Sequence, residues 1–437
     1  MCHIKKIVRD FLKKYGLYYG DIDFEQNCQI FIEEMNRGLQ GKTSSLEMIP
    51  TYIEVGKKII VDEPVIVLDA GGTYFRSALV SFNKERKAVI DHLKVYPMPG
   101  LSGGITREAF FEIMADYIDG IVKLGSRIGF CFSYPFQATS EKDGRLISLS
   151  KEIQVEGIEG ELIGQNLLAA LKLNGHSIDK KIVLINDTVA SLLAGTSISS
   201  ELLYDSYIGY VLGTGTNSSY LEKNENITKL KGRDKTKSMV INVESGGYGK
   251  APRGIIDMEF DSKLKDPGNY VFEKMLGGRY LGNLVLMTVQ KAGEEAIFSP
   301  DFSRKIMKVL NLETKDISSF LNDPLADNNT LSECLWTGND KDGAVLHLIL
   351  NMMIERAAVL AAINLSSIII KINKGIDPCR PVCISAEGST FYHLTGFQNK
   401  LNYYLKKYLT DKKGRYYNFV RVDNATLIGT AIAGLTN

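Results

Sequence analysis

The sequence predicts an α/β protein in which two related domains face each other across a cleft. Strand-like and helix-like segments alternate along the 437 residues, as they do in α/β folds with crossover connections. Twice, an apolar strand leads into a glycine-rich turn and then a second strand, once within residues 65–80 and once within residues 207–221. Because the same unit occurs in two copies, we expect two domains of related build.

Composition narrows the class of protein. With 52 basic and 51 acidic residues the formal net charge is +1, so the chain lacks the basic excess of a dedicated nucleic-acid binder. Hydrophobic residues make up 44% of the chain, which excludes a disordered chain of low hydrophobicity and high net charge. The length is sufficient for two or three domains with large cores.

Cysteines and apolar runs indicate the compartment. The six cysteines are scattered, and no second pair accompanies Cys379 and Cys383 at zinc-site spacing, so we expect reduced thiols in the cytoplasm. The N-terminal segment lacks the apolar core of a signal peptide. The longest uncharged apolar stretch, Ala357 to Ile370, is shorter than the ~20 residues of a membrane span. It predicts a buried helix that runs into a buried strand, and no membrane contact.

Local patterns predict the individual elements in order. Phe31, Met35 and Leu39 recur at helical spacing, so a helix precedes the first strand. The elements expected after the first hairpin are a strand at 127–135 stopped by proline, a buried strand at 182–185, a helix at 189–195 and a solvated loop at 223–237.

The two glycine-rich turns are candidates for binding phosphate. They are residues 69–73 (Asp-Ala-Gly-Gly-Thr) and 213–217 (Gly-Thr-Gly-Thr-Asn). Such turns expose backbone N–H groups, and glycine permits close approach of a bulky anion. A purely structural turn is the alternative for either copy alone.

A polar pair, Asn186 and Asp187, ends the buried strand at 182–185. Asp187 or the following Thr188 is a possible N-cap of the next helix. The alternative is a ligand site, because ligands of open α/β sheets bind at the carboxyl ends of the strands.

Several common catalytic motifs are absent from the sequence. No G-x-x-x-x-G-K-[ST] run is present, and no G-x-G-x-x-G follows a strand, so neither a P-loop nor a dinucleotide fold is supported. No G-x-S-x-G elbow is present either.

Taken in order, many segments resemble blocks of one known family. The segments are 69–76, 132–135, 186–189, 213–217, 241–244, 266–268, 272–275 and 280–282, together with the lead-in at 48–52. The chain is similar over about Phe31 to Gly434 to the eukaryotic-type hexokinase family, in the actin-like sugar kinase superfamily.

The resemblance implies a two-lobed actin-like ATPase (ribonuclease H-like) fold with a cleft between a small and a large domain. The small domain is expected at 61–187 plus 424–437, and the large domain at 1–60 plus 188–423. The implied reaction is ATP-dependent phosphorylation of the 6-hydroxyl of a hexose, the first step of glycolysis, with Mg²⁺ as metal. Glucose is the expected hexose, with mannose or fructose as alternatives. The protein is expected to be a monomer or homodimer.

The resemblance also implies roles for individual residues. Asp187 would be the general base, with Lys151 as the second catalytic residue. The sugar-binding residues would be Ser133, Ser150, Lys151, Asn186, Asp187, Asn217, Glu244 and Glu273. The residues at the ATP phosphates would be Asp69, Gly71, Gly72, Thr73, Arg76, Gly213, Thr214 and Gly215. Gly388 and Ser389 would lie at the adenosine, and Asp69 would hold Mg²⁺ directly or through water.

The chemistry fits these residue types. Sugar hydroxyls donate and accept together, and fixed carboxylates and amides pair with both functions. A hydroxyl acceptor has a very high pKa, so a carboxylate beside it can take the proton as phosphoryl transfer proceeds.

Three segments depart from the family pattern. Asn269-Tyr270 replaces two glutamines, the second of which contacts the sugar in the family. Glu387 replaces an aspartate before Gly388-Ser389, and residues 423–429 replace a Gly-Ser-Gly run. These departures point to changes in the sugar pocket and the adenine pocket.

Two other functions remain as alternatives at this point. One is a catalytically weak sugar-sensing protein on the hexokinase scaffold, against which the presence of Asp187, Lys151 and Asp69 argues. The other is an actin-like or chaperone ATPase, against which the set of sugar contacts argues.

Overall fold

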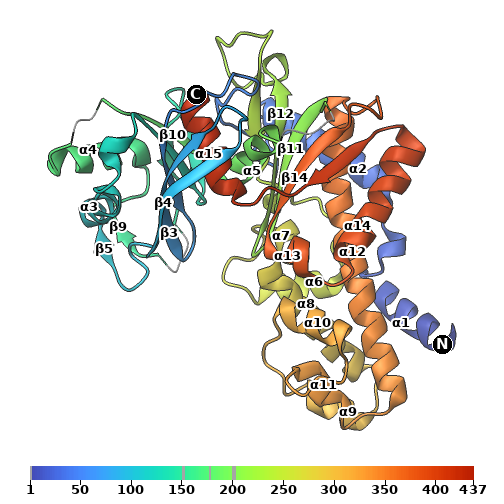
Figure 1. Cartoon of the computed structure of the whole chain (residues 1–437). Helices are drawn as coiled ribbons and strands as arrows, with labels where there is room; N and C mark the ends of the chain where they lie inside the picture. Colours follow the sequence, from blue (N-terminus) through green and yellow to red (C-terminus); the bar gives the residue numbers. More distant parts are fainter. Residues whose placement is uncertain (1, 150–152, 177–178, 199–202) are drawn as a thin grey trace.

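The computed structural model describes residues 2–149, 153–176, 179–198 and 203–437. Two β-sheets lie in two lobes, with helices around each of them (Figure 1).

The smaller lobe contains a five-stranded sheet. Its strands are β10 (Lys181–Ile185), β6 (Arg127–Phe132), β2 (Val65–Ala70), β3 (Tyr74–Phe82) and β4 (Ala88–Pro97), in that spatial order. The first three run parallel, and the last two pairings are antiparallel. Two short ribbons lie in the same lobe: β5 (Ile105–Thr106) with β9 (Val155–Glu156), and β7 (Phe136–Ala138) with β8 (Gly144–Leu146).

The larger lobe contains a six-stranded sheet. Its strands are β15 (Tyr417–Val420), β14 (Val382–Glu387), β11 (Ser206–Leu212), β12 (Thr216–Lys223), β13 (Ser238–Asn242) and β1 (Ile49–Pro50), in spatial order. Two parallel pairings are followed by three antiparallel ones. The first five strands therefore repeat the pairing pattern of the smaller sheet, which is the relation that the two glycine hairpins predicted.

Helices cover both sheets. Those of the smaller lobe are α3 (Arg107–Ile118) and α4 (Ile163–Leu173). Those around the larger sheet are α1 (Cys2–Lys14), α2 (Phe24–Leu39), α6 (Ile255–Ser262), α7 (Val271–Leu276), α8 (Gly278–Glu294), α9 (Pro300–Ile306), α10 (Thr314–Asn322), α11 (Thr330–Leu335), α12 (Asp340–Ile372), α13 (Ser389–His393) and α14 (Phe397–Leu405), which continues as a π-helical segment (Lys406–Lys412).

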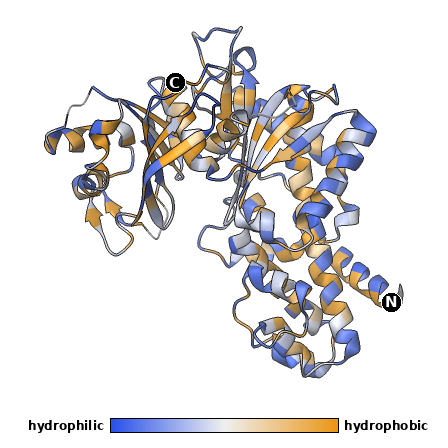
Figure 2. Cartoon of the chain, viewed as in Figure 1, coloured by the Kyte–Doolittle hydropathy of each residue, from blue (hydrophilic) through white to orange (hydrophobic). Residues whose placement is uncertain are grey.

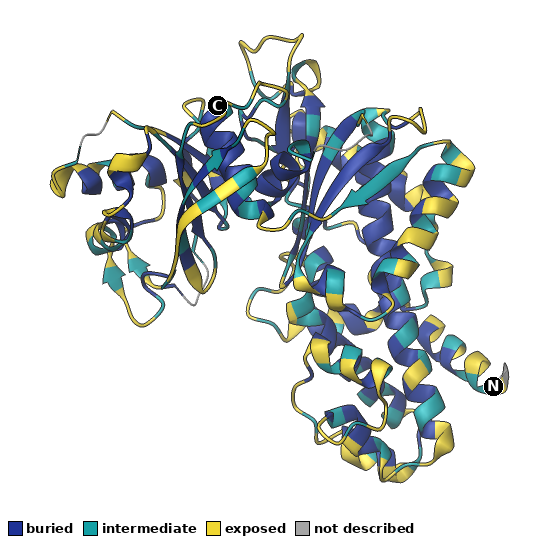
Figure 3. Cartoon of the chain, in the orientation of Figure 1, coloured by how far each residue is buried: buried dark blue, intermediate teal, exposed yellow. Residues whose placement is uncertain are grey.

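Strand β2 shows how the smaller lobe is held. Its side chains alternate between the two faces of the sheet, as the period of a strand requires. Ile66 and Leu68 join the core under α3 and α4, whereas Val65 and Val67 join a second core. All six residues of β2 are buried, and Figures 2 and 3 show the apolar, buried central strands of both sheets. The buried strand therefore anchors the start of the glycine turn at residues 71–73.

Two helices lie between the sheets: α5 (Asp187–Thr196) and α15 (Ala425–Thr436). They share the second core with strands of the smaller sheet, and α5 also packs on β11 and β14 of the larger sheet. The expected division at 187/188 and 423/424 therefore falls at the start of α5 and just before α15. That these two parts move as separate domains stays a prediction.

Helix α12 corrects one expectation. Residues 357–370 lie within a single 33-residue helix, so the predicted change from helix to strand is wrong. This helix is long and apolar enough to cross a membrane, but 89% of its most apolar window is buried inside the protein. It serves as a core helix of the larger lobe.

Candidate active site

Asp187 occupies the first turn of α5, directly after β10. The N-cap is Asn186, whose Oδ1 accepts hydrogen bonds from the Thr188 N–H at 3.0 Å and the Thr188 hydroxyl at 2.6 Å. Asp187 and Thr188 therefore do not serve as the cap, contrary to the alternative that the sequence left open. The Asp187 carboxylate is held by the Thr188 N–H at 2.7 Å, through Oδ1. No hydrogen bond from another described residue reaches its Oδ2.

The surroundings of Asp187 suit a base. Burial raises the pKa of its carboxyl to about 6; the Thr188 N–H opposes this shift and the Asp69 carboxylate adds to it. A carboxyl with a pKa near neutrality is a better proton acceptor than an ordinary aspartate and is still ionised at pH 7.

Asp69 is the last residue but one of strand β2 and pairs across the hairpin with Arg76 of β3. The Arg76 Nε donates to Asp69 Oδ2 at 2.7 Å, and an Nη group donates to the same oxygen. Burial raises the pKa of the Asp69 carboxyl, while the charge of Arg76 lowers it. The predicted metal ligand is thus an almost fully buried acid whose counter-charge is a protein cation.

The two glycine turns carry unused donors. Within the described part of the chain, four backbone N–H groups of the turns donate to no acceptor: those of Gly72, Thr73, Thr214 and Gly215. A Cβ added at Gly72 would meet nothing within 4 Å, so the turn has open space before it. Free N–H groups beside open space fit the oxygens of a phosphate. The neighbouring Gly71 is tied into its own turn through its N–H to Tyr74 O at 3.0 Å.

Ser133 follows β6 and lies beside the first turn. Its N–H donates to Ala70 O at 3.1 Å, and the hydroxyl of Tyr134 donates to Gly71 O at 2.7 Å. The two other residues expected near the sugar from this lobe, Ser150 and Lys151, lie outside the described residues.

Glu244 follows β13 of the larger lobe in the left-handed backbone region, with φ of 55°. Its Oε1 accepts from Asn242 Nδ2 at 2.6 Å and from Asn217 Nδ2 at 3.2 Å. Burial raises the pKa of this carboxyl to about 7; Glu47 and Asp187 contribute to the rise, and the bond from Asn242 opposes it. Glu244 and Asp187, from different elements, therefore lie close enough to influence each other's charge.

Glu273 comes from α7 and lies beneath the second glycine turn. Its Oε2 accepts from the Thr216 N–H at 3.1 Å. A Cβ added at Gly215 would lie 2.2 Å from the same Oε2, so a larger residue there would displace the Glu273 carboxylate. Burial raises the pKa of the Glu273 carboxyl.

A common pattern emerges from the predicted sugar ligands. Glu244, Glu273 and Asp187 each commit one carboxylate oxygen to the protein, and no described residue bonds the other. The Asn186 Nδ2 likewise has no bond within the described ranges. Asn217 differs, because its Oδ1 accepts from the N–H groups of Ser218 and Ser245 while its Nδ2 serves the protein.

Sequence reasoning missed two buried polar residues of this site. Thr188 is fully buried and Asn242 is 5% exposed, and both bond the predicted ligands. It also missed the charge of Glu47, which faces Glu244. Thr188 and Asn242 belong to the segments that carry the resemblance. Their nearness in sequence to Asn186 and Glu244 was the signal that could have indicated a role in the site.

Two of the residues that depart from the family pattern, Tyr270 and Glu387, lie close to charged groups of the site. Tyr270 directly precedes α7 with φ of 50°, and its hydroxyl faces Glu244 and Glu47; burial first, and then these two carboxylates, raise its pKa to about 12. Burial raises the pKa of Glu387 to about 7, with Arg421, Asp423 and Arg76 among the charges it faces. Both changed residues thus face the charged groups of the site.

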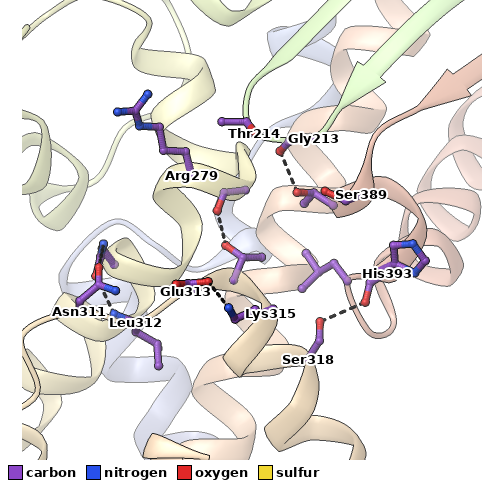
Figure 4. A pocket seen from close by; sticks show the side chains of 15 residues that line it. Gly213, Thr214, Arg279, Asn311, Leu312, Glu313, Lys315, Ser318, Ser389 and His393 are labelled. Carbon is purple, nitrogen blue, oxygen red and sulfur yellow. Dashed lines mark hydrogen bonds and ion pairs between the residues drawn. The ribbon is translucent and has the colours of Figure 1, made fainter. Parts of the chain in front are cut away.

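A pocket of about 600 Å³ adjoins the second glycine turn (Figure 4). Gly213, Thr214 and Ser389 form one wall, and Thr390 Oγ1 donates to Gly213 O at 2.8 Å. The other walls come from α8, α10 and α13, with Lys315 among them. Gly388, with φ of 109°, passes so close to Leu212 O that a Cβ there would lie 2.2 Å away. The two residues expected near adenosine therefore lie beside the phosphate turn.

Two sheets with one pairing pattern, a glycine turn at the end of each, and a carboxylate between them define a two-lobed, actin-like sugar kinase. Models of the hexokinase family match residues 8–197 and 207–436, and the chain belongs to the hexokinase family. It is 29% identical to hexokinase-7 of Oryza sativa subsp. japonica over 423 residues, which cover 91% of this chain and 90% of the relative. It is 28% identical to hexokinase-1 of Schizosaccharomyces pombe, covering 92% and 85%.

A solved structure supports the fold. The Schistosoma mansoni hexokinase complexed with glucose superposes with a TM-score of 0.79 at 23% identity, covering 99% of this chain and 98% of that one. The sequence-based identification of the family and of the two-lobed α/β fold is therefore confirmed. The protein is an enzyme of the hexokinase type, and no finding supports the sugar-sensing alternative.

Proposed function

We propose that this hexokinase uses ATP with Mg²⁺ to phosphorylate the 6-hydroxyl of glucose or a closely related hexose. The observation that carries the proposal is the buried Asp187 carboxylate at the start of α5, whose pKa is raised by Asp69 and which itself raises the pKa of Glu244. The glucose complex of the S. mansoni enzyme, which shares the fold, supports glucose as the hexose.

The free acceptors and donors bind and orient the sugar. The second oxygens of Glu244 and Glu273 accept hydrogen bonds from ring hydroxyls, and Asn186 Nδ2 donates to one. Bonds to ionised carboxylates are about twice as strong as neutral ones and fix the orientation of the ring. Asp187 then takes the proton of the reacting hydroxyl, with the Thr188 N–H fixing the direction of its carboxylate.

The residues fit a magnesium nucleotide. The free N–H groups of the two turns suit phosphate oxygens, Asp69 would supply an oxygen ligand of the kind that Mg²⁺ prefers, and the pocket beside Ser389 suits a nucleoside. Bound Mg²⁺ would stabilise the charge of the transferred phosphoryl group. Arg76 must then share or release Asp69, which makes its guanidinium available to phosphate.

A coupled kinase assay with a panel of hexoses and nucleotides tests the proposal, with Asp187→Asn as the inactive control. Hexose-dependent consumption of ATP is expected. ATP consumption that is indifferent to every hexose, or none with any hexose, would refute it.

We also propose a cytoplasmic enzyme, active as a monomer or homodimer. The cysteines from Cys28 onward are free thiols, and all of them except Cys379 are buried, which agrees with a reducing compartment. Fractionation of cells and light scattering of the purified protein test the two statements.

A further inference from the structure

Asn242 is the last residue of β13 and lies between two predicted sugar ligands. Its Nδ2 donates to Glu244 Oε1 at 2.6 Å, and its Oδ1 accepts from Asn217 Nδ2 at 2.8 Å. Both functions of the buried amide are therefore directed at the site. The Thr188 hydroxyl lies 3.5 Å from the same Oδ1, which brings the first turn of α5 to this point.

We propose that Asn242 is a positioning residue that fixes the direction of the Glu244 carboxylate and so sets the affinity for hexose. It occupies one oxygen of Glu244 and leaves the other for the sugar. The inference rests on the proposed function, because it takes Glu244 as a hexose ligand.

The backbone of Glu244 explains why its side chain must be held. A non-glycine residue at φ of 55° is uncommon, because the left-handed region is sterically unfavourable for an L-residue. Such a conformation persists only where neighbouring groups determine it. The bonds from Asn242 and Asn217 to one oxygen are the described side-chain contacts that do so.

Charge gives Asn242 a second effect. The groups that face Glu244 are Glu47 from the segment before β1, Asp187 from α5, Glu273 from α7 and the hydroxyl of Tyr270. The carboxylates among them disfavour its ionised form, and the Asn242 amide donates to that form. Hexose binding needs the carboxylate, so loss of the amide donor should move the pH dependence of binding to higher pH.

Two substitutions test the inference. Asn242→Asp keeps the size and the acceptor for Asn217, but it replaces the donor to Glu244 by a like charge. Asn242→Leu removes both bonds. The matched control is Asn364→Leu in α12, because Asn364 is a fully buried asparagine that contacts β12 only through the Ser218 hydroxyl at 3.2 Å. Among the described residues its Nδ2 has no hydrogen-bond partner, so the substitution removes one buried hydrogen bond, the one from Ser218, and tests whether such a loss alone changes the KM.

Steady-state kinetics over pH 5.5–9 decide the question, with thermal melting to verify folding. For Asn242→Asp we expect the KM for hexose at pH 7 to rise about tenfold or more, the range of a lost charged hydrogen bond. We expect the acid limb of kcat/KM to move up by about one pH unit, while kcat at saturating hexose and high pH changes little. The control should keep the wild-type KM and pH profile.

The outcomes separate the two claims. A folded Asn242→Asp protein with an unchanged KM and acid limb would overturn the inference, even if its melting temperature falls, because a purely structural residue behaves in that way. If Asn242→Leu does not fold, the isosteric aspartate variant still decides. A wild-type enzyme that shows no hexose-dependent turnover would instead overturn the proposed function.

Discussion

The carboxylate of Asp69 is bonded through one oxygen to the guanidinium of Arg76, its neighbour across the β2–β3 hairpin. The side chain of Asp69 is 7% exposed and that of Arg76 is 34% exposed, so the arginine lies on the solvent side of the pair. In the absence of a metal, Arg76 supplies the positive charge that the buried acid requires.

This pair predicts a specific response to magnesium. In Arg76→Ala, Asp69 is left buried without its partner, so the free energy of unfolding should fall by about 1–3 kcal/mol. Added Mg²⁺ should then raise the melting temperature of the variant more than that of the wild type, because the cation meets an unpaired carboxylate. Scanning calorimetry with and without Mg²⁺ measures the difference. The double variant with Asp69→Asn should lose the extra response, and an equal response in all proteins would contradict the assignment of Asp69.

Replacing Asp187 should separate catalysis from binding. Asp187→Asn keeps the shape of the side chain but removes the base, so kcat should fall by about 10²–10⁴-fold while calorimetry still detects hexose binding. Near-normal turnover would show that another group takes the proton.

The same variant should be more stable than the wild type at neutral pH. The folded pKa of about 6 lies above the ordinary value of 3.8, so folding disfavours the ionised form. The stabilisation due to the protonated acid is complete below 3.8 and is lost as the pH rises through 6. At pH 7.5 we expect Asp187→Asn to gain about 1–2 kcal/mol in chemical denaturation. A less stable variant would contradict the raised pKa.

Activity should rise with pH in the acid range. The base must be ionised, so kcat should increase through an apparent pKa near 6 and level off above it. Hexose binding should add an ionisation near 7, the pKa of Glu244. The kcat and kcat/KM profiles separate the two, since the first reports on the complex. Full activity at pH 4.5 would contradict both assignments.

Gly215 offers a steric test of Glu273. Gly215→Ala places a methyl group 2.2 Å from Glu273 Oε2, so the carboxylate must move away from the Thr216 N–H. We expect a rise of about tenfold or more in the KM for hexose. The control is Gly120→Ala, because a Cβ there meets nothing within 4 Å. Equal KM values for both variants would remove Glu273 from the sugar site.

The sequence predicted those parts of the protein whose pattern is local. The hairpins of β2–β3 and β11–β12 each show an apolar strand, a glycine turn and a second strand, so their existence and kinship were readable. Helix α12 was not, because a helix that is apolar on all sides has no helical periodicity and its end resembles a buried strand.

The sequence singled out residues that are expected to bind ligand, and it missed the residues whose side chains bond those ligand-binding groups. Asn186 as N-cap differs by one residue from the expected position, which is within the ordinary error of helix boundaries. Asn242 ends an apolar strand and bonds across two strands and a turn. Such a role depends on side-chain geometry in three dimensions, and no spacing along the chain encodes it.

Helices α5 and α15 meet at a point where Gly429 lies against the backbone of Ala190. A methyl group on Gly429 would lie 1.8 Å from the carbonyl oxygen of Ala190, so the two rods touch main chain to main chain. Helices in such close contact can rotate about their crossing point. They cannot slide along each other without a steric clash. Since Asp187 stands one turn before Ala190, we expect any rotation of the lobes to turn about this crossing and to move the Asp187 carboxylate with it.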